Sequence, residues 1–215
     1  GRISPYGERT FSRNPIEVTR MEDGKSPATR QCLLAAAQQL FAAHGYHGAS
    51  IREIVRSCEV SNAALYYHFG SKQNLYAEVL RAYIAAVVEK LQEADAGKGT
   101  CRSRLSQVAL AYATIILESE NLLQTLLRDA AHFDPEDIVR LLPELSSQIP
   151  AVISKILEDG IAAGELRAVA PHRTGILLMG MVNAMAVRRL YAEVNTTLEE
   201  DTDLVIDILF QGICA

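Results

Sequence analysis

The sequence predicts an all-α protein built from two helical units. Apolar residues make up 49% of the 215 residues, Ala and Leu are frequent, and aromatic residues amount to 6%. After residue 25, apolar positions recur at the three- and four-residue spacing of helices, and short turns separate the periodic segments. The segments show no strand-like alternation. A chain of this length can bury a sizeable core without metals or disulfides.

Residues 1–25 are expected to be a flexible N-terminal arm or a remnant of cloning, with Met21 as an alternative first residue. They are polar, rich in Gly, Pro, Arg and Ser, and lack periodicity. A basic arm can enter a minor groove. The composition favours the simpler interpretation, a disordered tail.

A first helix is expected from Ser26 to about His44. Ser26 is a good N-cap, and Pro27 suits the first helical position. Gly45 is placed to end the helix, because glycine readily adopts the left-handed conformation found after helix C-termini. The apolar residues of the expected inner face are Leu33, Ala36, Ala37, Leu40 and Phe41.

Two short helices joined by a tight turn are predicted to follow. Ser50 and Glu53 have the spacing of a capping box, which marks the start of the first helix. Residues 58–60 form the turn, and Ser61 caps the second helix. Ser71 then caps a long third helix. This is the helix-turn-helix arrangement, whose second helix has the size that fits the DNA major groove.

The second short helix carries residue types that contact DNA. Asn62 offers an amide that can pair with adenine, and the small Ala63 and Ala64 let the helix approach base edges. Leu65 and Phe69 are expected to point into the core. The side chains expected to donate to phosphate oxygens are Tyr66, Tyr67, His68 and Lys72.

The aromatic run at residues 65–69 can also be interpreted as a core segment of a helical bundle, which is what tyrosine pairs usually are. The caps, the turn and the lysine at the next helix N-terminus favour DNA binding, because a helix N-terminus attracts phosphate.

The same stretch resembles the DNA-binding domain of the TetR family of bacterial transcriptional regulators. The resemblance covers residues 28–80 and rests on Phe41, Gly45, Ser50, Ile51, Arg52, Glu53, Ile54, Val60, Ser61, Leu65, Tyr66, Tyr67, His68, Phe69, Ser71, Lys72 and Leu75.

The resemblance implies a dimeric repressor that binds a palindromic operator and is controlled by a small-molecule ligand. It implies a helix-turn-helix domain at residues 26–75 and a ligand-binding and dimerisation domain at residues 76–215. It also implies that Arg52 contacts a base or a phosphate, and that Ser50 helps to hold the DNA backbone.

The charge distribution fits DNA binding at the N-terminal end. Residues 1–75 hold nine Lys or Arg and six Asp or Glu residues, a net charge of +3, whereas residues 76–215 carry −8. The overall charge of −5 therefore hides a positive helix-turn-helix end.

The second domain is expected to be a bundle of helices at residues 71–92, 102–119, 121–133, 135–142, 144–163, 171–194 and 198–213. The last two are apolar on more than one side, so each needs two partners. TetR-like proteins pair through their last two helices, which favours a homodimer over two central helices of one monomer.

A mostly apolar pocket with a few polar groups is expected in this bundle. Its candidate lining residues are Tyr83, Tyr112, Ile116, His132, Phe133, Met179 and Asn183. His132 can equally be a lone polar group of the core. The apolar balance of the set indicates an uncharged or amphipathic organic ligand.

The sequence shows no catalytic or metal-ligand motif, so we expect neither an enzyme nor a cofactor. The four cysteines lack a paired spacing, which argues against disulfides and for a reducing, cytoplasmic setting. No apolar run is long enough to cross a membrane. The alternative function is an all-α ligand-binding or enzymatic protein with a vestigial helix-turn-helix.

Overall fold

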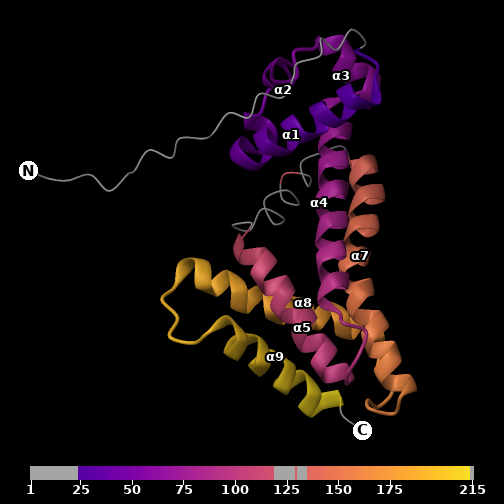
Figure 1. Ribbon diagram of the computed structural model, residues 1–215, viewed down its shortest axis with the longest axis vertical. Coiled ribbons are helices and arrows are strands. Elements are labelled where there is room, and N and C mark those ends of the chain that lie inside the picture. The colour runs from indigo at the N-terminus through magenta and orange to yellow at the C-terminus, as the bar shows by residue number, and fades with distance from the viewer. Residues whose placement is uncertain (1–23, 119–128, 130–134, 214–215) are drawn as a thin grey trace, which may run out of the picture.

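The computed structural model describes residues 24–118, 129 and 135–213, and within them it confirms the all-α class (Figure 1). The helices are α1 (Pro27–Gly48), α2 (Ile51–Ser57), α3 (Asn62–Phe69), α4 (Lys72–Ala94), α5 (Cys101–Glu118), α7 (Pro135–Ala162), α8 (Pro171–Tyr191) and α9 (Leu198–Ile213). The expected arm up to residue 23 lies outside the described residues, as does the expected helix at 121–133 apart from residue 129, so His132 and Phe133 are not described.

The first three helices form one unit around the start of α4 (Figure 1). Its core contains Leu33, Phe41, Ile54 and Leu65, each 0% exposed. Gly45 has φ +67°, so the helical conformation of α1 is interrupted where the sequence predicts its end. The left-handed conformation there requires a residue without a Cβ penalty, and glycine supplies it.

The long helix α4 leaves this unit and runs beside α7, while α5, α8 and α9 pack together at the far end (Figure 1). The α4 helix therefore belongs to both units. Its buried stripe includes Leu75, Val79, Val87 and Leu91, as its apolar spacing predicts.

The predicted break between helices at 135–142 and 144–163 is wrong. A single helix, α7, continues from Pro135 to Ala162 through Pro143 and Pro150. A proline inside a helix removes one backbone hydrogen bond, but it does not have to end the helix. Packing of α7 along both α4 and α8 supplies the stabilisation that local propensity does not.

The expectation that the chain has no disulfide is also wrong. Cys32 of α1 and Cys58 at the C-terminus of α2 form a disulfide, with their Cα atoms 5.9 Å apart. They are 26 residues apart in the sequence, so no short motif signals the pairing. Cys101 is free and buried.

Helices α8 and α9 are apolar on two sides, as predicted. Leu178, Val182 and Ala186 of α8 are buried in the bundle, and Ile206 of α9 is 0% exposed. The large apolar side chains that remain exposed on α8 and α9 are Ile176, Leu177, Tyr191, Leu204 and Ile208.

The loop between α4 and α5 is fixed by Arg104, whose side chain is 13% exposed. Its guanidinium donates to Asp95 at 2.7 and 2.8 Å and to Asp159 of α7 at 3.0 Å.

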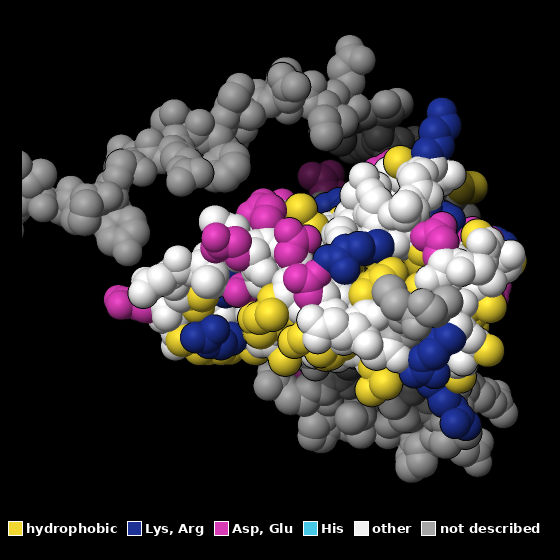
Figure 2. Space-filling view, turned by 90° about the horizontal axis from the view of Figure 1, so that it is seen from below, with side chains coloured by type: hydrophobic (Ala, Val, Ile, Leu, Met, Phe, Trp, Pro, Cys, Tyr) yellow, Lys and Arg dark blue, Asp and Glu magenta, His cyan; other side chains and the backbone are white. Residues whose placement is uncertain are grey.

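The far end of the bundle carries acidic side chains next to exposed hydrophobic ones (Figure 2). No helix in the described ranges has the length and apolarity needed to span a bilayer.

Candidate nucleic-acid interface

Three serine caps set the orientation of the helix-turn-helix. The Ser50 hydroxyl accepts from the Glu53 backbone N–H at 3.2 Å, and the Glu53 carboxylate accepts from the Ser50 N–H at 2.9 Å. The Ser61 hydroxyl accepts from the Ala64 N–H at 3.3 Å, and Ser71 caps α4 in the same way. The predicted capping box and both further caps are confirmed, so local chemistry fixes where each helix starts.

One side of α3 faces solvent and the other faces the core. Leu65 is 0% exposed and Phe69 is 6% exposed, which confirms their predicted core positions. The exposed side chains are Asn62, Ala63, Tyr66 and Tyr67. Residues 62 and 66, and likewise 63 and 67, are four apart, so these four side chains share one helix face.

Ala64 does not belong to this exposed face. It is 6% exposed and lies on the core side of α3, although the sequence analysis expected it to face bases. The Cβ of Ala64 is also close to Gly24, where an added Cβ would approach it to 3.3 Å. The burial of Ala64 depends on the angle at which α3 packs against its neighbours. The apolar pattern of an eight-residue helix does not reveal that angle.

Two predicted phosphate contacts near the start of α2 and the end of α3 have protein partners. The Ser50 hydroxyl donates to the Glu53 carboxylate at 2.6 Å, and these hydrogen bonds from Ser50 lower the pKa of Glu53. The His68 Nε2–H donates to the Gly24 carbonyl oxygen at 3.0 Å. Arg52, in contrast, has an exposed side chain on α2.

Lys72 is half-buried at the junction of α1 and α4. Its ammonium group donates to the Tyr46 carbonyl oxygen and stands 4.4 Å from the centre of the Tyr46 ring. Burial lowers the pKa of Lys72. The lysine therefore joins the two helices in this structure.

The sequence analysis missed one cation beside the exposed face of α3. Lys25 lies 5.2 Å from the centre of the Tyr67 ring, although the sequence suggested that it belonged to a flexible arm. Its position directly before the Ser26 cap was the available signal. Residues 24–75 hold five Lys or Arg and two Asp or Glu residues, so the described unit is basic.

Asp129 connects the second domain to the helix-turn-helix unit. Its Oδ2 atom accepts from the Tyr46 backbone N–H at 2.9 Å and from the Tyr76 hydroxyl at 3.3 Å. A Cβ at Gly45 would lie 3.0 Å from the same oxygen, so the close approach depends on glycine. Sequence reasoning did not single out Asp129, because its partners are far away along the chain.

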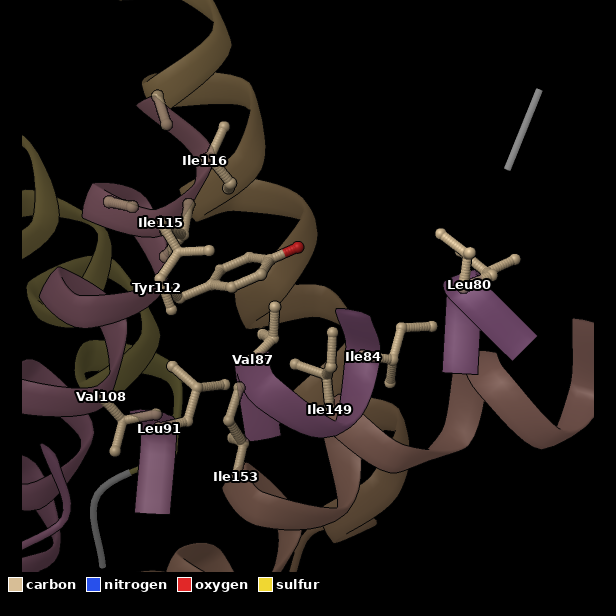
Figure 3. Packing of buried hydrophobic residues seen from close by; sticks show 14 of the residues in the cluster. Leu80, Ile84, Val87, Leu91, Val108, Tyr112, Ile115, Ile116, Ile149 and Ile153 are labelled. Atoms are coloured by element: carbon tan, nitrogen blue, oxygen red, sulfur yellow. The ribbon is translucent and has the colours of Figure 1, made fainter. Parts of the chain in front are cut away.

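Three of the predicted ligand contacts lie on α4 and α5. Tyr112 and Ile116 are buried, and Tyr83 is half-buried. Burial and, secondly, the neighbouring Tyr83 raise the pKa of Tyr112 to about 12. Figure 3 shows Tyr112 and Ile116 among apolar side chains of α4, α5 and α7, including Ile84, Val87 and Ile149.

The other two described ligand candidates, Met179 and Asn183, are half-buried on α8, which packs against α5. A surface groove of about 440 Å³ lies between α4 and α5, and no described ligand candidate lines it. Its lining residues are Lys90, Gln107, Leu110, Ala111, Thr114, Ile115 and Glu118. In the part of the chain that the structure describes, no acidic, His or Cys cluster could hold a metal ion.

Both units match known families. The family of bacterial regulatory proteins of the tetR type matches residues 33–79, and the C-terminal domain described as tetracyclin repressor-like matches residues 98–187. The chain belongs to the TetR family. Members of the TetR family are transcription factors, so the chain is a DNA-binding transcriptional regulator and not an enzyme.

Individual relatives agree with this membership. The HTH-type transcriptional repressor KstR2 of Rhodococcus jostii is 26% identical over 201 residues, which cover 94% of this chain and 97% of the relative. A TetR-family regulator from Mesorhizobium loti has a TM-score of 0.74 at 18% identity, over 87% of this chain and 98% of that chain. FadR from Bacillus subtilis, solved in complex with stearoyl-CoA, has a TM-score of 0.69 at 17% identity, over 85% and 98%. Both of these solved structures share the fold of this chain.

Proposed function

We propose that two copies of this chain bind a palindromic operator as a repressor and leave it when a small amphipathic molecule binds the second domain. The exposed face of α3, held by the caps described above, is the observation that carries this proposal. In this proposal α3 enters the major groove, where Asn62 and Ala63 approach base edges.

The remaining contacts hold the DNA backbone. Tyr66 and Tyr67 are exposed beside Asn62 and Ala63, and their hydroxyls can donate to phosphate oxygens. Arg52 of α2 and Lys25, which lies next to the Tyr67 ring, add exposed positive charge. Ser50, His68 and Lys72 remain proposed backbone contacts, and each would exchange a protein partner for a phosphate.

Dimerisation through α8 and α9 is supported by their exposed apolar side chains. Leu177 and Tyr191 of α8 are 65% and 80% exposed, and Leu204 and Ile208 of α9 are 51% and 54% exposed. The two helices pack side by side, so these side chains can form a continuous apolar surface. A second copy would bury it and set two α3 helices about 34–36 Å apart, the spacing of operator half-sites.

The effector is proposed to be amphipathic. The apolar residues Leu110, Ala111 and Ile115 line the α4–α5 groove, and so does the Lys90–Glu118 ion pair, whose charged atoms are 3.8 Å apart. The buried region around Tyr112 offers further apolar surface. Because FadR, a protein of this fold, binds stearoyl-CoA, acyl thioesters of coenzyme A are the first class to test.

Asp129 and α4 are proposed to carry the signal from effector to DNA. The Asp129 carboxylate holds the end of α1, and α4 reaches from Lys72 beside the DNA-binding face to Lys90 beside the groove. A shift of either element changes the separation of two α3 helices in a dimer. By linkage, the effector and the DNA must weaken each other's binding by the same factor.

Operator selection from random DNA with the full chain tests the proposal. We expect a palindromic site bound by a dimer, and we expect members of an acyl-CoA series to weaken its binding. A selected site without two-fold symmetry would contradict the dimeric operator complex. Unchanged affinity across the thioester series would contradict the proposed effector class.

A further inference from the structure

A cysteine pair stands at the entrance to the DNA-contacting helix. Cys32 lies on α1, and Cys58 is the C-cap of α2. Their Cα atoms are 5.9 Å apart, a separation within the range of protein disulfides, and the sulfurs are bonded. Ser61, the N-cap of α3, follows only three residues after Cys58, so the link fastens the turn before α3 to α1.

We propose that this pair is a redox switch for DNA binding, in which the disulfide form binds the operator tightly and the dithiol form binds it weakly. The inference rests on the DNA-binding role of α3. It adds a second input to the regulator, independent of the small-molecule effector.

The turn between Cys58 and α3 is tight, so movement at Cys58 reaches α3. The backbone N–H groups of Cys58 and Val60 both donate to the Val55 carbonyl oxygen, at 3.2 and 3.1 Å. Glu59 between them has φ +54°, a left-handed conformation that is uncommon for a residue other than glycine. Because these hydrogen bonds hold the turn in one conformation, a displacement of Cys58 also moves the start of α3.

Reduction of the pair removes the covalent link between α1 and the turn before α3. Cys58 is 8% exposed and belongs to the apolar core of this unit. In the dithiol form the turn before α3 is no longer tied to α1, so Asn62 and Ala63 can move relative to the rest of the unit.

The exposure of Cys32 and Cys58 indicates which of the two reacts first with an oxidant. Cys32 is half-buried and Cys58 is buried, so the Cys32 thiolate is the one that meets a small oxidant. With glutathione disulfide, Cys32 attacks one sulfur and releases one glutathione thiol. The Cys58 thiol then displaces the second glutathione. Two electrons and two protons pass from the cysteine pair to the two glutathione molecules.

Cys101 supplies the contrast within the same chain. It is 2% exposed, and its thiol donates weakly to the Ile156 carbonyl oxygen at 3.5 Å. Burial, followed by the nearby Glu165, raises the pKa of Cys101 to about 11. Because the thiolate is the reactive form, Cys101 is expected to be inert at neutral pH.

The test compares operator binding by one protein in two redox states. The full chain is treated with dithiothreitol or with glutathione disulfide, and fluorescence anisotropy measures its affinity for the site selected with the oxidised protein. Peptide mapping without reductant checks the Cys32–Cys58 link. We expect reduction to weaken binding about tenfold or more, since one lost base contact in each half-site is enough for that. Reoxidation should restore it.

Three variants sharpen the comparison. Cys32→Ser/Cys58→Ser should bind like the reduced wild type in both states, whereas Cys101→Ala should keep the switch. Cys58→Ser should retain one glutathione on Cys32. Circular dichroism verifies folding of each variant, and the wild-type comparison needs no substitution.

Equal affinities of the oxidised and reduced wild type would overturn the switch, as would failure of glutathione disulfide to join Cys32 to Cys58. If neither redox state bound any DNA, the DNA-binding function itself would be contradicted. That result differs from equal binding in both states, so the two failures are distinguishable.

Discussion

The Asp129 carboxylate accepts a hydrogen bond at 2.9 Å from the backbone N–H of Tyr46, a residue 83 positions earlier in the chain. The Tyr76 hydroxyl donates to the same oxygen at 3.3 Å. One side chain of the second domain thus holds both the end of α1 and the upper part of α4. A ligand that moves Asp129 must break these bonds or move the DNA-binding unit with it.

Asp129→Ala is predicted to uncouple the two domains. Loss of a carboxylate that accepts two hydrogen bonds should cost about 1.5–3 kcal/mol of the free energy that joins them. Calorimetry should then show the helix-turn-helix unit unfolding separately and at a lower temperature. An effector should also change operator affinity by a smaller factor. Asp129→Asn, which keeps an acceptor oxygen, is the control and should lie between the two proteins. A single unchanged transition in Asp129→Ala would refute the coupling.

Asn62→Ala is predicted to relax base preference at one position of each half-site. Asn62 is exposed at the start of α3, and a paired amide contributes about 1–3 kcal/mol of discrimination. Selection from random DNA should show the loss as a weaker preference at symmetric positions. Asn74→Ala, an exposed Asn on α4 outside this face, should leave the selected sequence intact. Identical selected sites for wild type and Asn62→Ala would remove Asn62 from base recognition.

The starts of the helices could be predicted from the sequence because their causes are local. Ser50, Ser61 and Ser71 cap the helices as expected, since each cap needs only residues within the next turn. Gly45 also breaks the helical conformation where the sequence predicts the helix to end, because its backbone conformation is a property of glycine, although α1 continues to Gly48.

Features that depend on distant parts of the chain were not predictable in this way. The burial of Ala64 depends on how α3 packs, and the Cys32–Cys58 pairing depends on how α1 meets the turn after α2. The partner of Lys72 is a backbone carbonyl, which no side-chain pattern signals. The role of Asp129 could not be predicted from the sequence either, since a single Asp forms no periodic pattern.

Lys72→Ala is predicted to weaken binding to all DNA sequences alike and to reduce the slope of log K against log salt by about 0.9 for each subunit of the dimer. The substitution should also lower the melting temperature, because the Tyr46 carbonyl oxygen loses its ammonium partner. Lys98→Ala, in the exposed loop after α4, should change neither quantity. A lower melting temperature with an unchanged salt slope would mean that Lys72 only joins α1 to α4.

Asp201 is predicted to make stability depend on acid pH. Burial opposes its ionisation, but hydrogen bonds from Thr196 and Arg189 outweigh burial and lower its pKa. The Arg189 guanidinium lies 2.7 Å from the carboxylate, whose side chain is 5% exposed. A carboxyl group with a lowered folded pKa stabilises the fold above its ordinary value of 3.8 and loses this contribution as pH falls below it.

Thermal unfolding between pH 3 and 7 would measure this contribution. Asp201→Asn should cost about 2–3 kcal/mol at pH 7, since a largely buried charged hydrogen bond is lost, and the cost should shrink towards pH 3. Asp203→Asn is the control, because Asp203 is exposed on the same helix. A constant difference across the pH range would contradict the assignment to Asp201.

The apolar surface of α8 and α9 is predicted to hold the dimer together. Leu177→Glu or Ile208→Glu would place a charge without a partner inside that interface, which is costly. Both side chains are exposed in the single chain, so each variant should fold with normal helical content. Leu209 is a poorer choice, because it is 8% exposed and its substitution would disturb the monomer core.

Sedimentation should show the wild type as a dimer at micromolar concentration and both glutamate variants as monomers. Operator affinity should collapse in the variants, because a monomer cannot meet two half-sites together and loses the effective concentration of the second contact. Ala151→Glu, an exposed position on α7, should stay dimeric and bind normally. If the glutamate variants remained dimeric, the two-fold contact would have to lie on another surface, and the exposed stripes of α8 and α9 would need a different partner.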